Sequence, residues 1–422
     1  MSILTSALKV LVGRENVAFG TTAAVMVPLT VEVPQLPMGE GGREMLANNG
    51  SSAFQHDNRA MIRGLERRQP VKASMLARHS PAQLNAAATP PVAPSAGAGA
   101  LSQDIVLEHW LGGFNTGAGG VVTTGADENT VPLATSGHGA RFDVGQPAIF
   151  HVAGVPYVRI VSGIATDTLS TFPDLPGIPA SGQVVLNTTC FFRKELHTQT
   201  MTMEALHYES GTPEAQQRGR GVRGQCAWTA EVGGTAALAF DGMLQARDDG
   251  NLSLSITGTA EDMGPEVVWS GESYLFASGA TASPAHTCIS KIAVTVPNTW
   301  QEIMCVAGVE GASGVVMTGG RSAPATVEIT TEFDADYLTA FDAGTTYALL
   351  AYAVHGTGDA RRVTGWWFPR LAFDAEPTRV DEGGLVKSVL KFRALANANI
   401  AGDPLGASST DLSRSPVVLF RG

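Results

Sequence analysis

The chain is poor in charged residues and has no long apolar run. Lys, Arg, Asp and Glu make up 16% of its 422 residues, whereas it contains 48 glycines and 23 prolines. Helical proteins usually carry more Glu, Lys and Arg on their surfaces. No stretch approaches the roughly 18 apolar residues needed to cross a bilayer. The composition therefore predicts a mainly β protein with many turns and no membrane contact, and its low charge indicates a surface partly covered by neighbouring subunits.

Motifs that carry catalytic or metal chemistry are also missing. The nine histidines form no HExxH motif, no GxSxG elbow occurs, and the glycine-rich segments Gly219–Gly224 and Gly311–Gly314 lack the P-loop lysine. We expect these glycines in turns. The cysteines stand far apart without a CxxC pair, at Cys190, Cys226, Cys288 and Cys305. We therefore expect no enzyme, no cofactor and no metal site, and cysteines that act as small apolar residues in a reducing compartment.

The net charge of the chain is −11 and its pI is about 5.3. An acidic protein repels phosphate backbones, so tight binding of nucleic acid is disfavoured, whereas repulsion would suit nucleic acid that must slide past without sticking. The N-terminal segment has an apolar run without a preceding basic region or a clear cleavage site. We expect it to form a leading arm or strand, not a signal peptide.

A strand–helix–strands pattern occurs twice along the chain. The first copy has the strand Val71–Ser80, the helix Gln103–Leu111 and the strand segments Phe150–Ile164 and Gln183–Phe192. The second has the strand Ala325–Phe333, the helix Asp334–Phe341 and the strands Tyr347–His355, Val363–Phe373 and Val386–Leu395. The repetition predicts two related β modules, each with a short flanking helix. Residues 1–195 would hold the first module with an N-terminal arm, a long loop and an Ala/Pro-rich connector at 86–100, and residues 196–422 the second.

Apolar and polar residues alternate in many of these segments. In Met201–His207 the alternation places Thr202 and Glu204 on one face and the two methionines on the other. A hairpin is expected around Gly233-Gly234. Period-two alternation in both halves favours antiparallel sheets with one dry and one wet face.

Two stretches resemble tail tube proteins of long-tailed bacteriophages. One is TVEITTEFDADYLTAFDAGTTYAL followed by GGLVKSVLKFRAL, and the other is MTMEALHYESGTPEAQQRGRGVRGQCAWTAEVGGTAALAFDGML. The similarity covers most of Gln183–Leu395 and, more loosely, the first half. The chain departs from the family in its long Gly39–Ala100 region and in its size, which fits larger members with two tube folds in one chain.

The resemblance implies a β-sandwich or barrel fold that assembles into stacked rings and a hollow conduit for DNA. Rings of the larger members would be trimeric with pseudo-sixfold symmetry. The implied location is the virion tail, after synthesis in the host bacterial cytoplasm. The implied partners are the protein itself, the tail terminator, the tape measure and the baseplate proteins, with DNA passing transiently and without specificity.

Two sets of residues are candidates for roles in such a tube. A wet face that lines the channel and repels DNA would carry Thr202, Glu204, Glu328 and Glu332, although ordinary solvated residues would look the same. Contacts between subunits are expected from Arg63, Arg67, Arg218, Arg220, Arg223 and Trp367. For the arginines around residue 220, a mobile loop that meets carboxylates of the next subunit is favoured over nucleic-acid binding, because no aromatic residues are interleaved with them.

Two other functions fit the same sequence. A tail terminator, a head–tail connector or a capsid decoration protein would share the fold and also lack an active site. A carbohydrate-binding β-sandwich or a glycosidase would use Trp366 and Trp367 as a platform. Core or interface packing of the Trp366-Trp367-Phe368 run is the simpler interpretation, because alternation puts the middle residue on the opposite face from its neighbours.

Overall fold

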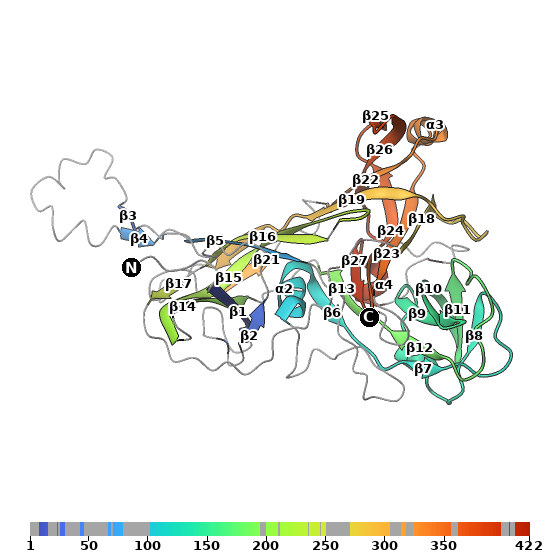
Figure 1. Cartoon of the computed structure of the whole chain (residues 1–422), viewed down its shortest axis with the longest axis horizontal. Helices are drawn as coiled ribbons and strands as arrows, with labels where there is room; N and C mark the ends of the chain where they lie inside the picture. The colour runs from blue at the N-terminus through green and yellow to red at the C-terminus, as the bar shows by residue number, and fades with distance from the viewer. Residues whose placement is uncertain are drawn as a thin grey trace, which may run out of the picture.

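The computed structural model describes residues 8–15, 23, 26–29, 43–45, 66–68, 71–78, 102–194, 200–209, 212–234, 236–244, 246–249, 271–303, 314–317, 324–355, 362–397, 405 and 410–422. Strands dominate these residues and all of their pairings are antiparallel, which confirms the predicted fold class (Figure 1). No helix among them is long and apolar enough to cross a membrane.

The secondary structure elements follow one another in this order. The strands before residue 200 are β1 (Leu8–Arg14), β2 (Val27–Leu29), β3 (Arg43–Met45), β4 (Glu66–Arg68), β5 (Val71–Arg78), β6 (Gly112–Asn115), β7 (Gly120–Val121), β8 (Thr130–Pro132), β9 (Pro147–Val152), β10 (Val155–Ala165), β11 (Thr168–Phe172), β12 (Val184–Asn187) and β13 (Thr189–Arg193). The later strands are β14 (Met201–Glu209), β15 (Thr212–Glu231), β16 (Ala237–Leu244), β17 (Ala246–Asp249), β18 (Gly271–Ala277), β19 (Ile289–Val296), β20 (Trp300–Ile303), β21 (Gly314–Met317), β22 (Thr326–Glu332), β23 (Tyr347–His355), β24 (Arg362–Phe373), β25 (Thr378–Glu382), β26 (Leu385–Ala394) and β27 (Val418–Arg421). The helices are α2 (Ser102–Leu111), α3 (Asp336–Asp342) and α4 (Asp411–Arg414), with a 3₁₀ turn at Gly139–Arg141.

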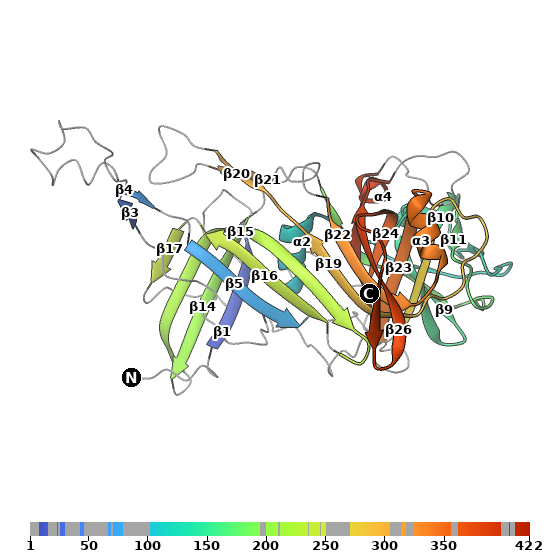
Figure 2. The ribbon, with the colours of Figure 1, turned by 90° about the horizontal axis from the view of Figure 1, so that it is seen from above.

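Sheet 1 is the curved sheet that we define by the strand order β5-β16-β15-β19-β22-β26-β25 (Figure 2). The long strand β15 also takes part in a side sheet, β2-β1-β14-β15-β17, through its first half. The predicted hairpin around Gly233-Gly234 is confirmed, since β15 and β16 pair from Arg223 opposite Met243 to Thr229 opposite Ala237.

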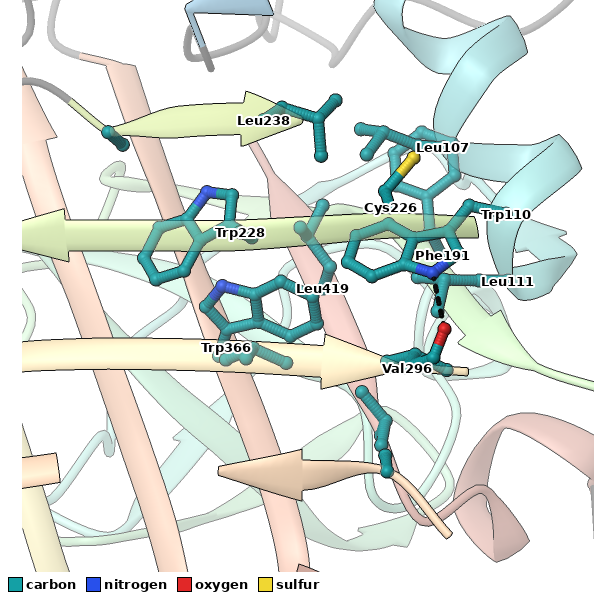
Figure 3. Close-up of a cluster of buried hydrophobic side chains, with 14 of the residues drawn as sticks. Leu107, Trp110, Leu111, Phe191, Cys226, Trp228, Leu238, Val296, Trp366 and Leu419 are labelled. Atoms are coloured by element: carbon teal, nitrogen blue, oxygen red, sulfur yellow. Dashed lines mark hydrogen bonds between the residues drawn. The ribbon is translucent and has the colours of Figure 1, made fainter. Parts of the chain in front are cut away.

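Sheet 2 has the order β18-β23-β24-β27-β13-β6 and packs against sheet 1. Strand β24 joins the two sheets, because its last residues pair with β26. Between the sheets, Trp366 contacts Trp228 with ring centroids 5.5 Å apart and Trp110 of α2 at 5.8 Å (Figure 3). The indole nitrogen of Trp110 donates to the Val296 carbonyl at 2.9 Å, which ties α2 to the end of β19 (Figure 3). This core makes the two sheets a β-sandwich.

A small closed barrel is inserted into this sandwich. Its six described strands have the order β7-β12-β9-β10-β11-β8, and a bridge between Val122 and Leu133 joins the two edge strands. The Ala134 amide donates to the Val121 carbonyl at 2.7 Å across that closure. The barrel has its own core, which includes Val131, Phe150, Val161, Leu169 and Val185. It interrupts the chain between β6 and β13, which pair directly with each other.

The barrel covers the face of sheet 2 that points away from sheet 1. A second apolar layer joins Ile149, Val158 and Ile160 of the barrel to Leu350, Trp367 and Phe420 of sheet 2. Strands of sheet 2 are therefore buried on both faces. This explains why segments such as Tyr347–His355 (YALLAYAVH) are apolar throughout, whereas the strands of sheet 1 alternate.

A buried arginine anchors the barrel to the sandwich. Arg159 of β10 donates to the Asp174 carbonyl at 2.9 Å, to the Tyr274 hydroxyl at 3.1 Å and to the Glu272 carboxylate at 3.3 Å. The Tyr352 hydroxyl donates to the same carboxylate at 2.6 Å. Burial alone lowers the pKa of Arg159, but Tyr352, Tyr274 and Glu272 outweigh it and raise this pKa, so the guanidinium stays charged.

The predicted elements are largely present, with three differences. Phe150–Ile164 contains parts of two strands, because the chain turns at Ala153 and Gly154, which both have positive φ. Gln183–Phe192 divides between β12 of the barrel and β13 of sheet 2. The two helices differ in role: Leu107 and Trp110 of α2 are fully buried, whereas α3 buries no residue completely.

The predicted module boundary at residue 195 falls between β13 and β14. Strands from the two sides of it are hydrogen-bonded to each other, β1 to β14, β13 to β27 and β5 to β16. The segments 1–195 and 196–422 therefore share their sheets. The connector at 86–100 lies outside the described residues.

Candidate assembly surfaces

The face of sheet 1 that points away from the sandwich core is polar. In β19, Ile292, Val294 and Val296 are buried in the core, and Lys291 and Thr295 alternate with them on the exposed side. Strands β22 and β26 alternate in the same way. Glu328 and Glu332 lie on this outward face, as the alternation of the sequence predicts.

Ion pairs balance the charge of this outward face. Glu328 stands opposite Lys391 in the register of β22 and β26, and their side chains are 3.2 Å apart. Three further pairs lie at the same sheet: Lys291 with Glu231 at 2.8 Å, Lys387 with Glu382 at 2.6 Å, and Arg393 with Asp374 at 3.6 Å. The face therefore carries cations beside its carboxylates, whereas the sequence led us to expect a channel surface that repels DNA. Each exposed pair stabilises the fold by only about 0–1 kcal/mol.

Thr202 and Glu204 do not lie on a wet face, which corrects the prediction. Their relative exposures are 0% and 1%. The Thr202 hydroxyl donates to the buried Glu15 carboxylate at 3.1 Å and accepts from the Ala23 amide at 3.0 Å. The alternation itself is right, because Met201 and Met203 face the sandwich core. On the opposite side, Ala23 and Met26 pack against Leu206 of β14 and Leu11 of the neighbouring strand β1.

The arginines near residue 220 lie in strand β15, not in a mobile loop, at a register shift against β14 where Gly221 has a φ of 62°. Arg218 forms an ion pair with Glu204, and burial raises the pKa of that carboxyl although Arg218 partly offsets the rise. Arg223 is 5% exposed and its guanidinium donates to the Gly221 carbonyl at 3.4 Å. The contacts of Arg218 and Arg223 within the chain replace the subunit contacts that we predicted for them. Arg220 is half-buried, and its contact with another subunit stays a prediction.

Trp367 is also buried within its own chain, at 2% exposure. It belongs to the apolar layer between sheet 2 and the barrel, while Trp366 and Phe368 face the sandwich core. The predicted alternation is confirmed, but the predicted subunit contact through Trp367 is wrong. Neither tryptophan forms a sugar platform, because both are covered on all sides.

The two subunit contacts predicted in the long loop before residue 70 stay predictions. Arg63 lies outside the described residues. Arg67 is in β4, where it stands opposite Glu44 of β3. In the described part of the chain, β3 and β4 pair only with each other.

Among the described residues, sheet 1 has two open edges, β5 and β25. The edge strand β25 was not predicted from the sequence. Strand β5 pairs only with β16, and β25 only with β26, among the described residues. Every residue of β25 is exposed. Leu385 and Val386 at the start of β26 are 66% and 54% exposed, although both are apolar. The β25–β26 hairpin could have been recognised from Gly383-Gly384, which stands between two alternating runs and favours a two-residue turn.

No group of His, Cys, Asp and Glu in the part of the chain that the structure describes is arranged to hold a metal ion. No family model matches the chain, and no curated protein matches it either. The described surfaces are thus a charge-balanced polar face and two open sheet edges.

Proposed function

We propose that this protein is a structural subunit that assembles with copies of itself into a hollow tube, the tail tube of a long-tailed bacteriophage. The observation that carries the proposal is sheet 1, which has one buried face, one polar face and an open edge on each side. Rings of such subunits, trimeric with pseudo-sixfold symmetry, would stack to form the conduit for DNA. The terminator, tape measure and baseplate proteins would be its partners in the virion tail.

Open edges on both sides favour a ring over a single pairing. An edge strand offers unpaired backbone donors and acceptors to another chain. When the contact is between two different edges, each copy binds one neighbour on either side, and the series closes if the rotation between copies permits it. Closure would join the copies of sheet 1 into one continuous barrel.

The layers of the sandwich define which side would face inward. The inserted barrel covers the side of the molecule opposite to the polar face of sheet 1. A ring closed through sheet 1 with its polar face inward would therefore carry the inserted barrels on the outside. Glu328 and Glu332 would then line the channel.

The paired charges of the polar face suit the passage of DNA. Lysines and arginines that bind phosphates release counterions and hold DNA in place. On sheet 1, Lys391 and Lys291 each have a carboxylate within 3.2 Å, so a phosphate would have to compete with that partner. Balanced charge would allow DNA to move through the channel without strong attraction or repulsion.

The first experiment is electron microscopy of the purified protein over a range of concentrations. Hollow tubes of uniform diameter with a regular axial repeat are expected. Monomers at every concentration and ionic strength would refute the proposal. Single rings that never stack would favour the alternative of a tail terminator or connector.

A pair of variants at one residue tests the role of the β25 edge. Gly383 and Gly384 have φ values of 66° and 83°, which is typical of a two-residue hairpin turn closed by Glu382 and Leu385. Antiparallel alternation then directs the Arg379 N–H away from β26. Arg379→Pro removes this donor, whereas Arg379→Ala removes the same side chain and keeps the donor.

We expect Arg379→Pro to reduce the assembled fraction at least tenfold and Arg379→Ala to stay within about threefold of the unmodified protein. Both variants should remain folded, because β25 is exposed throughout. Sedimentation velocity measures the assembled fraction, and circular dichroism checks the fold. Equal assembly of the two variants would mean that this edge takes no part in the tube.

A further inference from the structure

The directions of the strands in sheet 1 limit how two copies can meet. Each of the seven described strands is antiparallel to the next, so β5 and β25 at the two edges run in the same direction. Copies in a ring are related by rotation about the channel axis, which preserves the direction of strands that run along it. A contact between the β25 edge of one copy and the β5 edge of the next is therefore a parallel pair.

The charges of the two edge segments are complementary. Strand β5 (VKASMLAR) contains Lys72 and Arg78 and no carboxylate. Residues 376–382 contain Glu376, Asp381 and Glu382 and a single cation. The whole chain is acidic, so the two cations of β5 at one open edge are unusual.

The spacing of these charges selects one register. Lys72 and Arg78 are six residues apart, and so are Glu376 and Glu382. In a parallel pair both strands rise by about 3.3 Å per residue, so both cations can stand beside a carboxylate at once. The same alignment sets β5 residues 74–78 beside all five residues of β25.

The faces agree with this alignment. The register of β5 with β16 places Ser74 opposite Asp241 and Arg78 opposite Ala237, and both of these β16 positions lie on the side of sheet 1 that points away from the core. In β25, Val380 stands opposite Lys387 and Glu382 opposite Leu385, which puts its even-numbered residues on the same side. Residues that are aligned in a parallel pair of strands lie on the same side of the sheet, so the proposed alignment requires this match.

We propose that β25 of one copy pairs in parallel with β5 of the next, with Lys72 beside Glu376 and Arg78 beside Glu382. The inference rests on the proposed function, because it defines the lateral junction of that tube. The junction adds a strand pair with two ion pairs. It also places Val380, which is 38% exposed in the single chain, beside Leu76.

Charge reversal tests the register. Lys72→Glu and Glu376→Lys each create a like-charge pair at the junction, and the chain that carries both changes restores an attractive pair. We expect each single change to reduce the assembled fraction at least tenfold and the double change to recover it to within about threefold. Glu128→Lys on the exposed surface of the inserted barrel alters the net charge as Glu376→Lys does and should leave assembly unchanged.

Cysteine cross-linking gives a second readout that does not depend on charge. Leu76→Cys with Val380→Cys, in a background where Cys288→Ser removes the exposed thiol of the described residues and Cys305→Ser removes the fourth cysteine, should give a ladder of covalent multimers when assembled protein is oxidised. Leu76→Cys with Asp381→Cys places the second thiol on the other face and should give none. A ladder in the second pair alone, or in neither, would refute the register.

The proposed function and the proposed β25–β5 junction can be refuted separately. If the unmodified protein forms no rings or tubes, the proposed function is wrong. If it forms tubes, and the single reversals assemble as well as the unmodified protein, the function stands and the β25–β5 junction is refuted.

Discussion

Removal of the Arg159 guanidinium is expected to loosen the inserted barrel from the sandwich. Arg159 is 1% exposed, and its side chain reaches from β10 to carbonyls of the barrel and to polar groups of β18 and β23. In Arg159→Met the methionine fills a similar volume but donates no hydrogen bond. The Glu272 carboxylate keeps the two tyrosine hydroxyls as donors, at 2.8 and 2.6 Å.

The expected loss in the free energy of unfolding is about 2–4 kcal/mol. A hydrogen bond to a charged group contributes roughly 1.5–3 kcal/mol, and bonds in one network are not additive. Two carbonyls lose a donor in the variant, that of buried Val158 and that of half-buried Asp174. The cost stays below that of a fully buried broken ion pair, about 3–5 kcal/mol, because the Glu272 side chain is 29% exposed and water can reach it.

The same variant should change the response to acid. Burial raises the pKa of Glu272, but hydrogen bonds from Tyr352 and Tyr274 and the charge of Arg159 lower it further, so the net shift is downward. A carboxyl with a lowered pKa in the folded state contributes stability that is present above its unfolded pKa of about 4.3 and lost as the pH falls through the folded value. Arg159→Met removes part of this lowering, so its stability should fall less steeply with acid below about pH 5.

Urea denaturation at pH 7 and at several lower pH values measures both effects. The matched control is Arg141→Met, also in the barrel, because Arg141 is exposed and its guanidinium donates to the Gly119 carbonyl at 2.7 Å. The control should cost less than about 1 kcal/mol. A loss below 0.5 kcal/mol in Arg159→Met, or an unchanged acid response, would refute the role of Arg159 as the anchor.

Two further predictions concern the cores. Trp366→Ala should destabilise the protein by about 3–5 kcal/mol in urea denaturation, because it leaves a cavity beside Trp228, whereas Leu385→Ala at an exposed site should change the free energy of unfolding by less than about 0.5 kcal/mol. An equal effect of both would contradict the placement of the sandwich core. Burial raises the pKa of the Cys190 thiol to about 12 and also raises that of Cys226, so of the three thiols in the described residues only Cys288 should react with iodoacetamide in the folded protein, as mass spectrometry can check. Labelling of Cys190 or Cys226 at the rate of Cys288 would mean that the cores open readily.

The local elements of the fold could be predicted from the sequence. Alternation with period two identified β22 and β26 and placed Glu328 and Glu332 on the outward face. Turn glycines identified the β15–β16 hairpin, and the repeated strand–helix–strands pattern located α2 and α3. These features depend on residues that are neighbours in the chain, so a single sequence contains the information.

What covers each face was decided only by the tertiary structure. Thr202 and Glu204 look like wet-face residues because they alternate with methionines, yet both are buried. Glu15 and Ala23, from far earlier in the chain, bind Thr202, and Arg218 binds Glu204. Trp367 alternates correctly with its neighbours, and only the docking of the inserted barrel buries its side of sheet 2. The period of a strand shows that two faces differ, but it does not show how many layers lie on each.

The inserted barrel and the two open edges also depend on contacts between distant parts of the chain. The barrel depends on β6 and β13 pairing across the segment that separates them, and the edges depend on the order of seven strands from distant parts of the chain. The sequence by itself determined the strands, the hairpins and the alternation of their faces, because backbone geometry sets these locally. Strand order, layer number and free edges arise from long-range pairing, and the tertiary structure alone decided them.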